Sequence, residues 1–206
     1  KTTGALTIPE KSQINFNKYK DSFKKAADLQ IEFHNPLEKD RDTLSATNST
    51  SSIEDVCEHG NTLYAVMSID DGQTYEKYDN NDLRSHIEIC KNLAEAIERY
   101  HKRGYLHLDI NPDNILVLAD STMIKLFDFD TVQLMEDINN RKCRISYTEK
   151  FAPPELELVT RDRSYYSKID QRTDIYMIGA TLFYKLFDRT PYFSDKFPYQ
   201  TWDYNE

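Results

Sequence analysis

Glycine, cysteine and positive charge are scarce in this chain of 206 residues, and each shortage excludes a class of protein. The five glycines stand at positions 4, 60, 72, 104 and 179 and never cluster, which excludes a glycine-rich phosphate-binding loop. The three cysteines are widely separated and follow no CxxC or Cys/His metal spacing. We therefore expect free thiols in a reducing compartment.

Long apolar runs are also absent. No stretch approaches the roughly 20 residues of a membrane-spanning helix and no secretory signal opens the sequence, so we expect a cytoplasmic protein. The net charge of −9 argues against nucleic acid or an anionic membrane as the main partner. The chain starts at Lys1 and ends on the aromatic, polar stretch 197–206, so we expect a piece of a longer protein.

The composition suits a packed domain, because 39% of the residues are hydrophobic. Hydrophobic periodicity and turn residues predict the elements along the chain. The expected elements are an irregular lead-in at 1–16, a helix at 17–33, a loop at 37–52, strands near 52–58 and 62–69 around a turn at 59–61, a polar stretch to 79, a helix at 82–103, short strands at 114–118 and 123–127, and a helix at 173–187.

The two later helices have different patterns. The helix at 82–103 places its apolar residues on one face, and Gly104 is suited to end it. The helix at 173–187 has apolar residues on nearly every side, so we expect it to be buried all round. An acid, Asp174, stands near its start, where an N-cap is one interpretation.

The clearest chemical pattern is His107-Leu-Asp109-Ile-Asn-Pro-Asp-Asn114, followed by Asp128-Phe-Asp130. It places carboxylates and a carboxamide on short loops beside apolar strands. A carboxylate can accept the proton of a hydroxyl, and hard oxygen ligands hold magnesium. The pattern therefore predicts a site for a metal-bound phosphate and an acceptor hydroxyl. The competing interpretation is two polar turns flanking a hairpin, because Asp, Asn and Pro are common in turns.

The order of these residues resembles the protein kinase superfamily, including its bacterial members. Two further motifs add to the resemblance: Thr148-x-x-Phe-Ala-Pro-Pro-Glu155 is similar to the substrate-facing loop, and 174–179 is similar to the start of the buried central helix. The resemblance implies an α+β, bilobal kinase fold. Residues 1–69 would be the remainder of the N-lobe, and 70–206 would be a truncated C-lobe without the final helices.

The resemblance also implies roles for single residues. Asp109 would be the catalytic base, and Asn114 and Asp128 would hold the magnesium ions that bridge the phosphates of ATP. Thr148 would hydrogen-bond near Asp109 and help to fix it. Asn111 stands at a catalytic position where the family usually has a Lys that touches the γ-phosphate.

Structural roles follow in the same way. His107 would pack on Phe129, and Asp174 would accept hydrogen bonds from the backbone of the catalytic loop.

The nucleotide pocket is expected at the strand that ends near residue 69, which resembles the strand leading to the hinge between kinase lobes. Met67 would gate the back of the adenine pocket. The backbone of Ser68, Ile69 and Asp70 would hydrogen-bond the adenine, and Leu116 would lie under the ring.

Several positions depart from the family pattern. Leu108 replaces the Arg that pairs with a phosphate on the activation segment, so ordering by phosphorylation is not expected. Asn111 supplies no positive charge, and Asp130 replaces a flexible Gly. The nucleotide-anchoring Lys is missing from these residues. The helix at 17–33 offers no well-placed Glu to pair with such a Lys, because the spacing of Glu32 is poor.

Three functions remain open at this point. The first is an active Ser/Thr protein kinase that uses ATP and Mg²⁺ on a protein substrate. The second is a pseudokinase that binds nucleotide or acts as a scaffold. The third is a small-molecule kinase of the aminoglycoside or choline kinase type, in which the 148–155 loop and the 174–179 helix start would not be expected.

Overall fold

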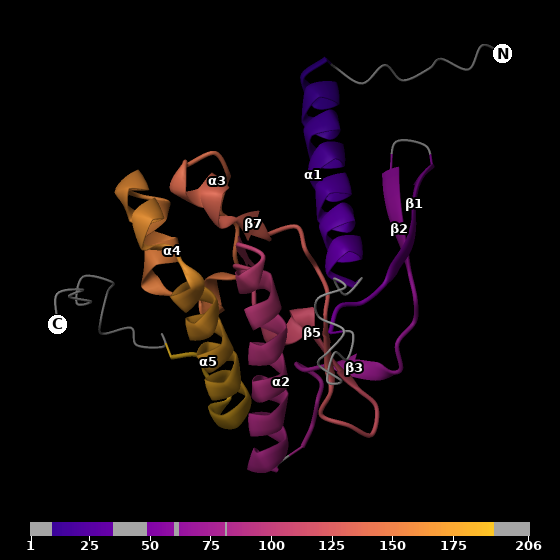
Figure 1. Ribbon diagram of the computed structural model, residues 1–206, viewed down its shortest axis with the longest axis vertical. Coiled ribbons are helices and arrows are strands. Elements are labelled where there is room, and N and C mark those ends of the chain that lie inside the picture. The colour runs from indigo at the N-terminus through magenta and orange to yellow at the C-terminus, as the bar shows by residue number, and fades with distance from the viewer. Residues whose placement is uncertain (1–9, 35–48, 60–61, 81, 192–206) are drawn as a thin grey trace.

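The computed structural model describes residues 10–34, 49–59, 62–80 and 82–191 (Figure 1). Its elements are α1 (Glu10–His34), β1 (Ile53–His59), β2 (Thr62–Met67), β3 (Gly72–Thr74), α2 (Leu83–Lys102), β4 (Tyr105–Leu106), β5 (Ile115–Leu118), β6 (Ile124–Leu126), β7 (Gln133–Leu134), α3 (Met135–Asn139), α4 (Pro154–Val159) and α5 (Gln171–Phe187), with 3₁₀ turns at Pro112–Asn114, Glu149–Phe151 and Arg163–Lys168. This mixture of helices and small antiparallel sheets confirms the α+β class.

The elements form two unequal parts. Helix α1 lies beside the β1–β2 hairpin at one side of the molecule, while α2 to α5 gather at the other (Figure 1). A three-stranded sheet in the order β3–β5–β6 and the pair β4–β7 complete the fold. No helix within the described ranges is long and apolar enough to cross a membrane.

Helix α1 begins earlier than predicted. The sequence suggested an irregular lead-in up to residue 16, but the helix already starts at Glu10. The segment from residue 10 to 16 lacks apolar periodicity, yet it contains neither Gly nor Pro and continues directly into a helix. Residues 1–9 of the expected lead-in lie outside the described residues.

The predicted hairpin is present. β1 and β2 pair antiparallel, with Ile53 opposite Met67 and His59 opposite Thr62. Residues 60–61 of the expected turn and positions 35–48, which include most of the predicted loop, lie outside the described residues. The last residues of that loop approach the three-stranded sheet, because Thr50 forms a parallel bridge with Leu126 of β6.

The short strand β3 was missed, because its sequence is polar and only three residues long. It pairs antiparallel with β5, with Gly72 opposite Leu118 and Thr74 opposite Leu116. A Cβ at Gly72 would lie 2.4 Å from the carbonyl oxygen of Val117, so the close approach of these strands requires glycine. Long-range pairing therefore creates this strand.

Helices α2 and α5 match the predictions for the most part. Asp82 caps α2 by accepting hydrogen bonds from two backbone N–H groups, and Gly104 follows its end with φ of +80°. In α5, Ile175 and Phe187 are 53% and 57% exposed, so the prediction of burial on every side is wrong. The residue that caps α5 is Asp170.

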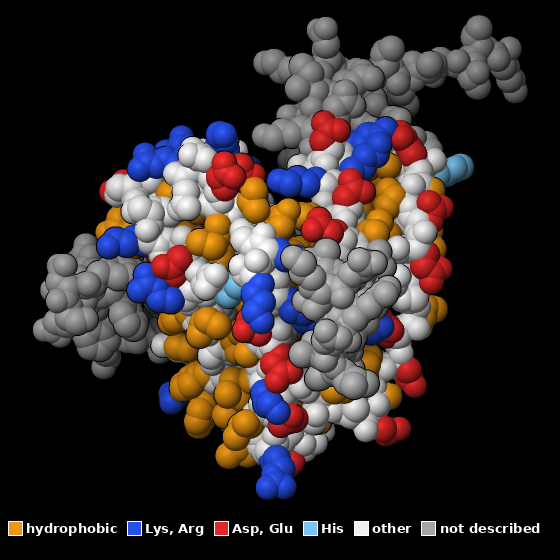
Figure 2. All heavy atoms as spheres, in the orientation of Figure 1, with side chains coloured by type: hydrophobic (Ala, Val, Ile, Leu, Met, Phe, Trp, Pro, Cys, Tyr) orange, Lys and Arg blue, Asp and Glu red, His pale blue; other side chains and the backbone are white. Residues whose placement is uncertain are grey.

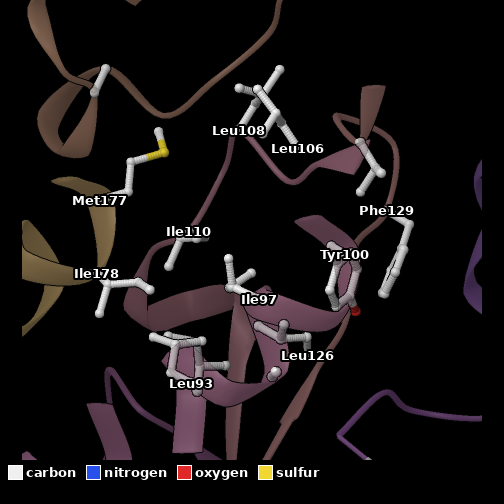
Figure 3. Packing of buried hydrophobic residues seen from close by; sticks show 14 of the residues in the cluster. Leu93, Ile97, Tyr100, Leu106, Leu108, Ile110, Leu126, Phe129, Met177 and Ile178 are labelled. Atoms are coloured by element: carbon white, nitrogen blue, oxygen red, sulfur yellow. The ribbon is translucent and has the colours of Figure 1, made fainter. Parts of the chain in front are cut away.

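The hydrophobic core joins α2, α5 and the segment between β4 and β5 (Figure 3). Leu106 at the end of β4, and Leu108 and Ile110 in that segment, are all fully buried. Each buried side chain of this kind stabilises the fold by about 1.5–3 kcal/mol. These buried side chains therefore anchor the segment that carries Asp109 to the core.

Candidate active site

Asp174, on helix α5, fixes the loop that follows β4 through hydrogen bonds. This carboxylate is fully buried and accepts hydrogen bonds from the backbone N–H groups of His107 at 3.0 Å and Leu108 at 2.9 Å. The Nε2 atom of His101 lies 2.8 Å from the same group. The predicted backbone contact is confirmed, whereas the N-cap interpretation of Asp174 is wrong, because Asp170 caps the helix.

Leu108 has a left-handed backbone, with φ of +66°, which is unusual for a residue with a branched side chain. Its side chain points into the core, where no solvent reaches it. Leu108 therefore contributes apolar packing where the resemblance would place an arginine. The reversal at this residue directs Asp109 away from the core.

Two groups orient the carboxylate of Asp109, which is 9% exposed. The backbone N–H of Thr148 donates to Oδ1 at 2.7 Å, and the amide of Asn114 donates to Oδ2 at 2.8 Å. Thr148 comes from the loop before α4, and Asn114 ends the 3₁₀ turn before β5. The structure thus brings these three predicted site residues together.

Asn111 connects the same two loops. Its Oδ1 accepts a hydrogen bond from the backbone N–H of Asp113 at 3.0 Å. Its Nδ2 lies 3.2 Å from the carbonyl oxygen of Asp109 and 3.3 Å from Oγ1 of Thr148. Both amide hydrogens therefore have acceptors within the protein, and the contact of Asn111 with a γ-phosphate stays a prediction.

Asn114 and Asp128 present the oxygens expected to hold magnesium. Asn114 donates through Nδ2 to both the carbonyl and the carboxylate of Asp109, which leaves its Oδ1 for a cation. Burial and the neighbouring charge of Asp130 raise the pKa of the Asp128 carboxyl to about 6.

The described residues contain no group of three or more His, Cys, Asp or Glu with metal-binding geometry. One carboxylate and one carboxamide still fit Mg²⁺, which usually takes its other ligands from phosphate and water.

Four aromatic rings pack against one another next to these loops. His107 and Phe129 pack with their centroids 5.8 Å apart, as predicted, and Tyr100 lies 5.7 Å from Phe129. Phe33 of α1 stacks on Tyr100 at 4.2 Å. Burial lowers the pKa of His107 and so disfavours its charged form, and neither ring nitrogen has a hydrogen-bond partner among the described residues.

Helix α1 presents no carboxylate at the level expected for a lysine partner. Gln30 is buried and donates to the carbonyl oxygen of Ser51 at 2.9 Å, and Leu29 beside it is also buried. Glu32 is exposed. The departure noted in the sequence is therefore present in the structure.

The expected adenine-binding residues lie at the end of β2, on the segment after it and on β5. The side chain of Ile69 is 99% exposed, and that of Met67 is 38% exposed. The N–H of Ser68 donates to the carbonyl of Ser52 at 3.3 Å. Leu116 is half-buried on β5.

Sequence reasoning missed Lys125, which pairs opposite Leu116 and forms an ion pair with Asp70. The sequence signal that could have drawn attention to Lys125 was its position on a short strand between the inward-facing Ile124 and Leu126.

A cavity of about 790 Å³ lies elsewhere, at the outer end of β3 and β5. Asp71, Tyr78, Asn80 and Ser85 are among its lining residues, and it contains none of the predicted catalytic or metal-binding residues. The predicted site is therefore a set of residues on loops beside this sheet and not this cavity.

Residues 41–203 match the family model of the protein kinase domain. The match covers more than half of the chain, and the chain belongs to the protein kinase family.

Individual relatives agree with this assignment. The chain is 26% identical over 161 residues to the smooth-muscle myosin light chain kinase of Gallus gallus, which covers 72% of this chain and 8% of that protein. It is 30% identical over 148 residues to a probable serine/threonine-protein kinase of Clostridium acetobutylicum, covering 70% of this chain and 22% of that protein. It is 24% identical over 202 residues to the dual specificity protein kinase TTK of Mus musculus, covering 90% of this chain and 22% of that protein. The chain thus spans less than a quarter of the length of each of these relatives.

Proposed function

We propose that this chain transfers the γ-phosphoryl group of ATP to a serine or threonine hydroxyl of a protein. The observation that carries the proposal is the fixed carboxylate of Asp109, held between Thr148 and Asn114 at 2.7 and 2.8 Å. A base must be within hydrogen-bond reach of the proton that it accepts, and this carboxylate is oriented before substrate arrives. The names of the bacterial relatives support serine/threonine as the acceptor.

The step is an in-line displacement. The acceptor oxygen forms a bond to the γ-phosphorus, the bond from that phosphorus to the bridging oxygen breaks, and ADP leaves. Asp109 takes the hydroxyl proton. Asn114 and Asp128 would hold Mg²⁺, which neutralises charge on the phosphates when bound. Ser68 to Asp70 and Leu116 would form the adenine side of the site, with Met67 at its back.

A nucleotide-binding or scaffolding module is the second candidate. It is favoured by Asp130, which places a second carboxylate beside Asp128. It is also favoured by helix α1, which offers no well-placed Glu for a nucleotide-anchoring lysine and buries Gln30 instead. A small-molecule acceptor is less well supported, because Thr148 and Glu155 belong to a loop that resembles the substrate-facing loop of protein kinases. A cytoplasmic setting fits the three free cysteines, all within the described residues.

The test uses the full chain with labelled ATP, Mg²⁺ and a mixed protein substrate. Asp109→Asn and Asp128→Asn are expected to lose transfer by at least about 10²-fold. Asp113→Asn is the matched control, because this exposed acid stands in the same turn and should keep activity. Equal labelling by wild type and Asp109→Asn would refute the proposal. ATP-dependent thermal stabilisation without transfer would assign the chain to the second candidate.

A further inference from the structure

The segment that leads to Thr148 has the opposite charge to the rest of the chain. Residues 141–150 contain four basic side chains and one acidic side chain, in a protein whose net charge is −9. Arg141, Lys142, Arg144 and Lys150 are all exposed. Figure 2 shows Lys and Arg side chains over the part of this face that carries α3 and α4, whereas acidic side chains prevail beside β1 and β2.

Two of these cations are available to a partner. Within the described part of the chain, neither Lys142 nor Arg144 takes part in an ion pair. The other two have neighbours. Arg141 lies near Asp162, whose pKa is lowered mainly by hydrogen bonds from Ser164 and less by Arg141. The ammonium of Lys150 lies 5.1 Å from the ring centroid of Phe151. The unpaired charge is therefore concentrated just before Thr148.

The position of this segment relates the charge to the acceptor. An acceptor hydroxyl at Asp109 must pass beside Thr148, whose N–H lies 2.7 Å from the Asp109 carboxylate. Arg144 is four residues before Thr148, and Lys142 is six residues before it. An extended chain covers about 3.5 Å per residue, so Arg144 lies within about 14 Å of Thr148. Such distances are within reach of the residues that flank an acceptor.

We infer that Lys142 and Arg144 select protein substrates whose acceptor serine or threonine is flanked by acidic residues. This inference rests on the proposed function, since it concerns the acceptor of the same site. An acidic protein segment suits the patch better than nucleic acid, because the segment leads directly to Thr148 beside Asp109 and the protein as a whole is negative. Cation–carboxylate attraction provides the selection.

The experiment measures peptide binding separately from transfer. Labelled peptides of about ten residues carry one serine flanked by either Asp or Asn, and their affinity for the full chain is measured by fluorescence anisotropy without ATP. The Asp peptide should bind about fivefold tighter at low salt, as expected for exposed charge pairs. The preference should disappear near about 0.5 M salt, where screening is strong.

Variants localise the effect. Lys142→Gln with Arg144→Gln should abolish the preference for the Asp peptide. Lys91→Gln with Lys102→Gln is the matched control, because both lysines are exposed on α2 and should leave the preference unchanged. Ser146→Glu places a carboxylate between the cations and Thr148, so it should also weaken binding of the Asp peptide.

Equal affinity of wild type for the Asp and Asn peptides would overturn the inference, as would equal loss in both double variants. Tighter binding of an oligothymidylate of the same length than of the Asp peptide would reassign the patch to nucleic acid. Acidic-peptide binding that depends on Lys142 and Arg144, without any transfer in the labelling assay, would uphold the patch and refute the proposed function. Transfer without a preference for the Asp peptide would uphold the proposed function and overturn the inference about Lys142 and Arg144.

Discussion

The amide of Asn114 donates to Asp109 twice, to its carbonyl oxygen at 3.0 Å and to its carboxylate at 2.8 Å. The side chain thereby fixes both the backbone and the functional group of the residue proposed as base. Its one remaining polar atom, Oδ1, is an acceptor. Asn114 is therefore suited both to position Asp109 and to bind a cation.

Replacing Asn114 by alanine should separate positioning from folding. Asn114→Ala removes one of the two donors to the Asp109 carboxylate, so kcat should fall by about 10²-fold while the fold is kept. Steady-state kinetics and far-UV circular dichroism measure the two effects. Asn92→Ala on α2 is the control, because the hydrogen bonds of its amide within the described residues go to Thr122 and Met123, away from Asp109. An unchanged kcat in Asn114→Ala would contradict the positioning role.

Loss of the Asp174 carboxylate should destabilise the protein strongly. Asp174→Ala leaves the buried N–H groups of His107 and Leu108 without acceptors, and each such group costs about 1–3 kcal/mol. We expect the free energy of unfolding to fall by about 3 kcal/mol, measured by urea denaturation. Asp170→Ala removes a more exposed N-cap and should cost only about 1 kcal/mol. Equal losses in both variants would disprove the special role of Asp174.

The Asp128–Asp130 pair should make stability depend on pH. The pKa of Asp128 is raised from 3.8 to about 6, so the folded state holds a proton that the unfolded state releases. Stability should therefore fall as pH rises from about 4 to about 6 and stay lower above that range. Asp130→Asn removes the neighbouring charge and should flatten this part of the profile. Thermal denaturation of both proteins between pH 4 and 8 without Mg²⁺ tests this, and identical profiles would contradict it.

Phe33 should connect helix α1 to the loop of residues 107–114. Its ring stacks on Tyr100, and the guanidinium of Arg103 lies 4.8 Å from its centroid. Phe33→Ala is expected to lower the free energy of unfolding by about 3 kcal/mol, as for other large-to-small changes in packed sites. Phe23→Ala on the same helix is the control, because Phe23 is 36% exposed. Comparable destabilisation of the two variants would show that the aromatic contacts add nothing.

The sequence predicted those features that depend on local pattern or fixed spacing. The apolar face of α2 and its end near Gly104 follow from helical periodicity, and the contact of Asp174 with the catalytic loop follows from the family resemblance. Both are found. The start of α1 at Glu10 was missed, because no apolar period marks that part of the helix.

Other features depend on contacts that no local pattern contains. β3 forms only because β5 lies beside it, and Gly72 is required there by a carbonyl 45 residues away in sequence. The ion pair of Asp70 with Lys125 joins residues 55 apart. The stacking of Phe33 on Tyr100 likewise requires α1 and α2 to be in place. Tertiary pairing decides such positions, and a single sequence does not show it.

The left-handed backbone at Leu108 has a consequence for the order of events during synthesis. A branched residue in this conformation costs on the order of 1–3 kcal/mol and persists only where the surroundings enforce it. The carboxylate that fixes it belongs to a residue 66 positions later in the chain. At about 5–20 residues per second, a ribosome needs on the order of 3–13 s to add that stretch. A nascent chain that ends before α5 would thus have the chemical groups of the loop without their arrangement.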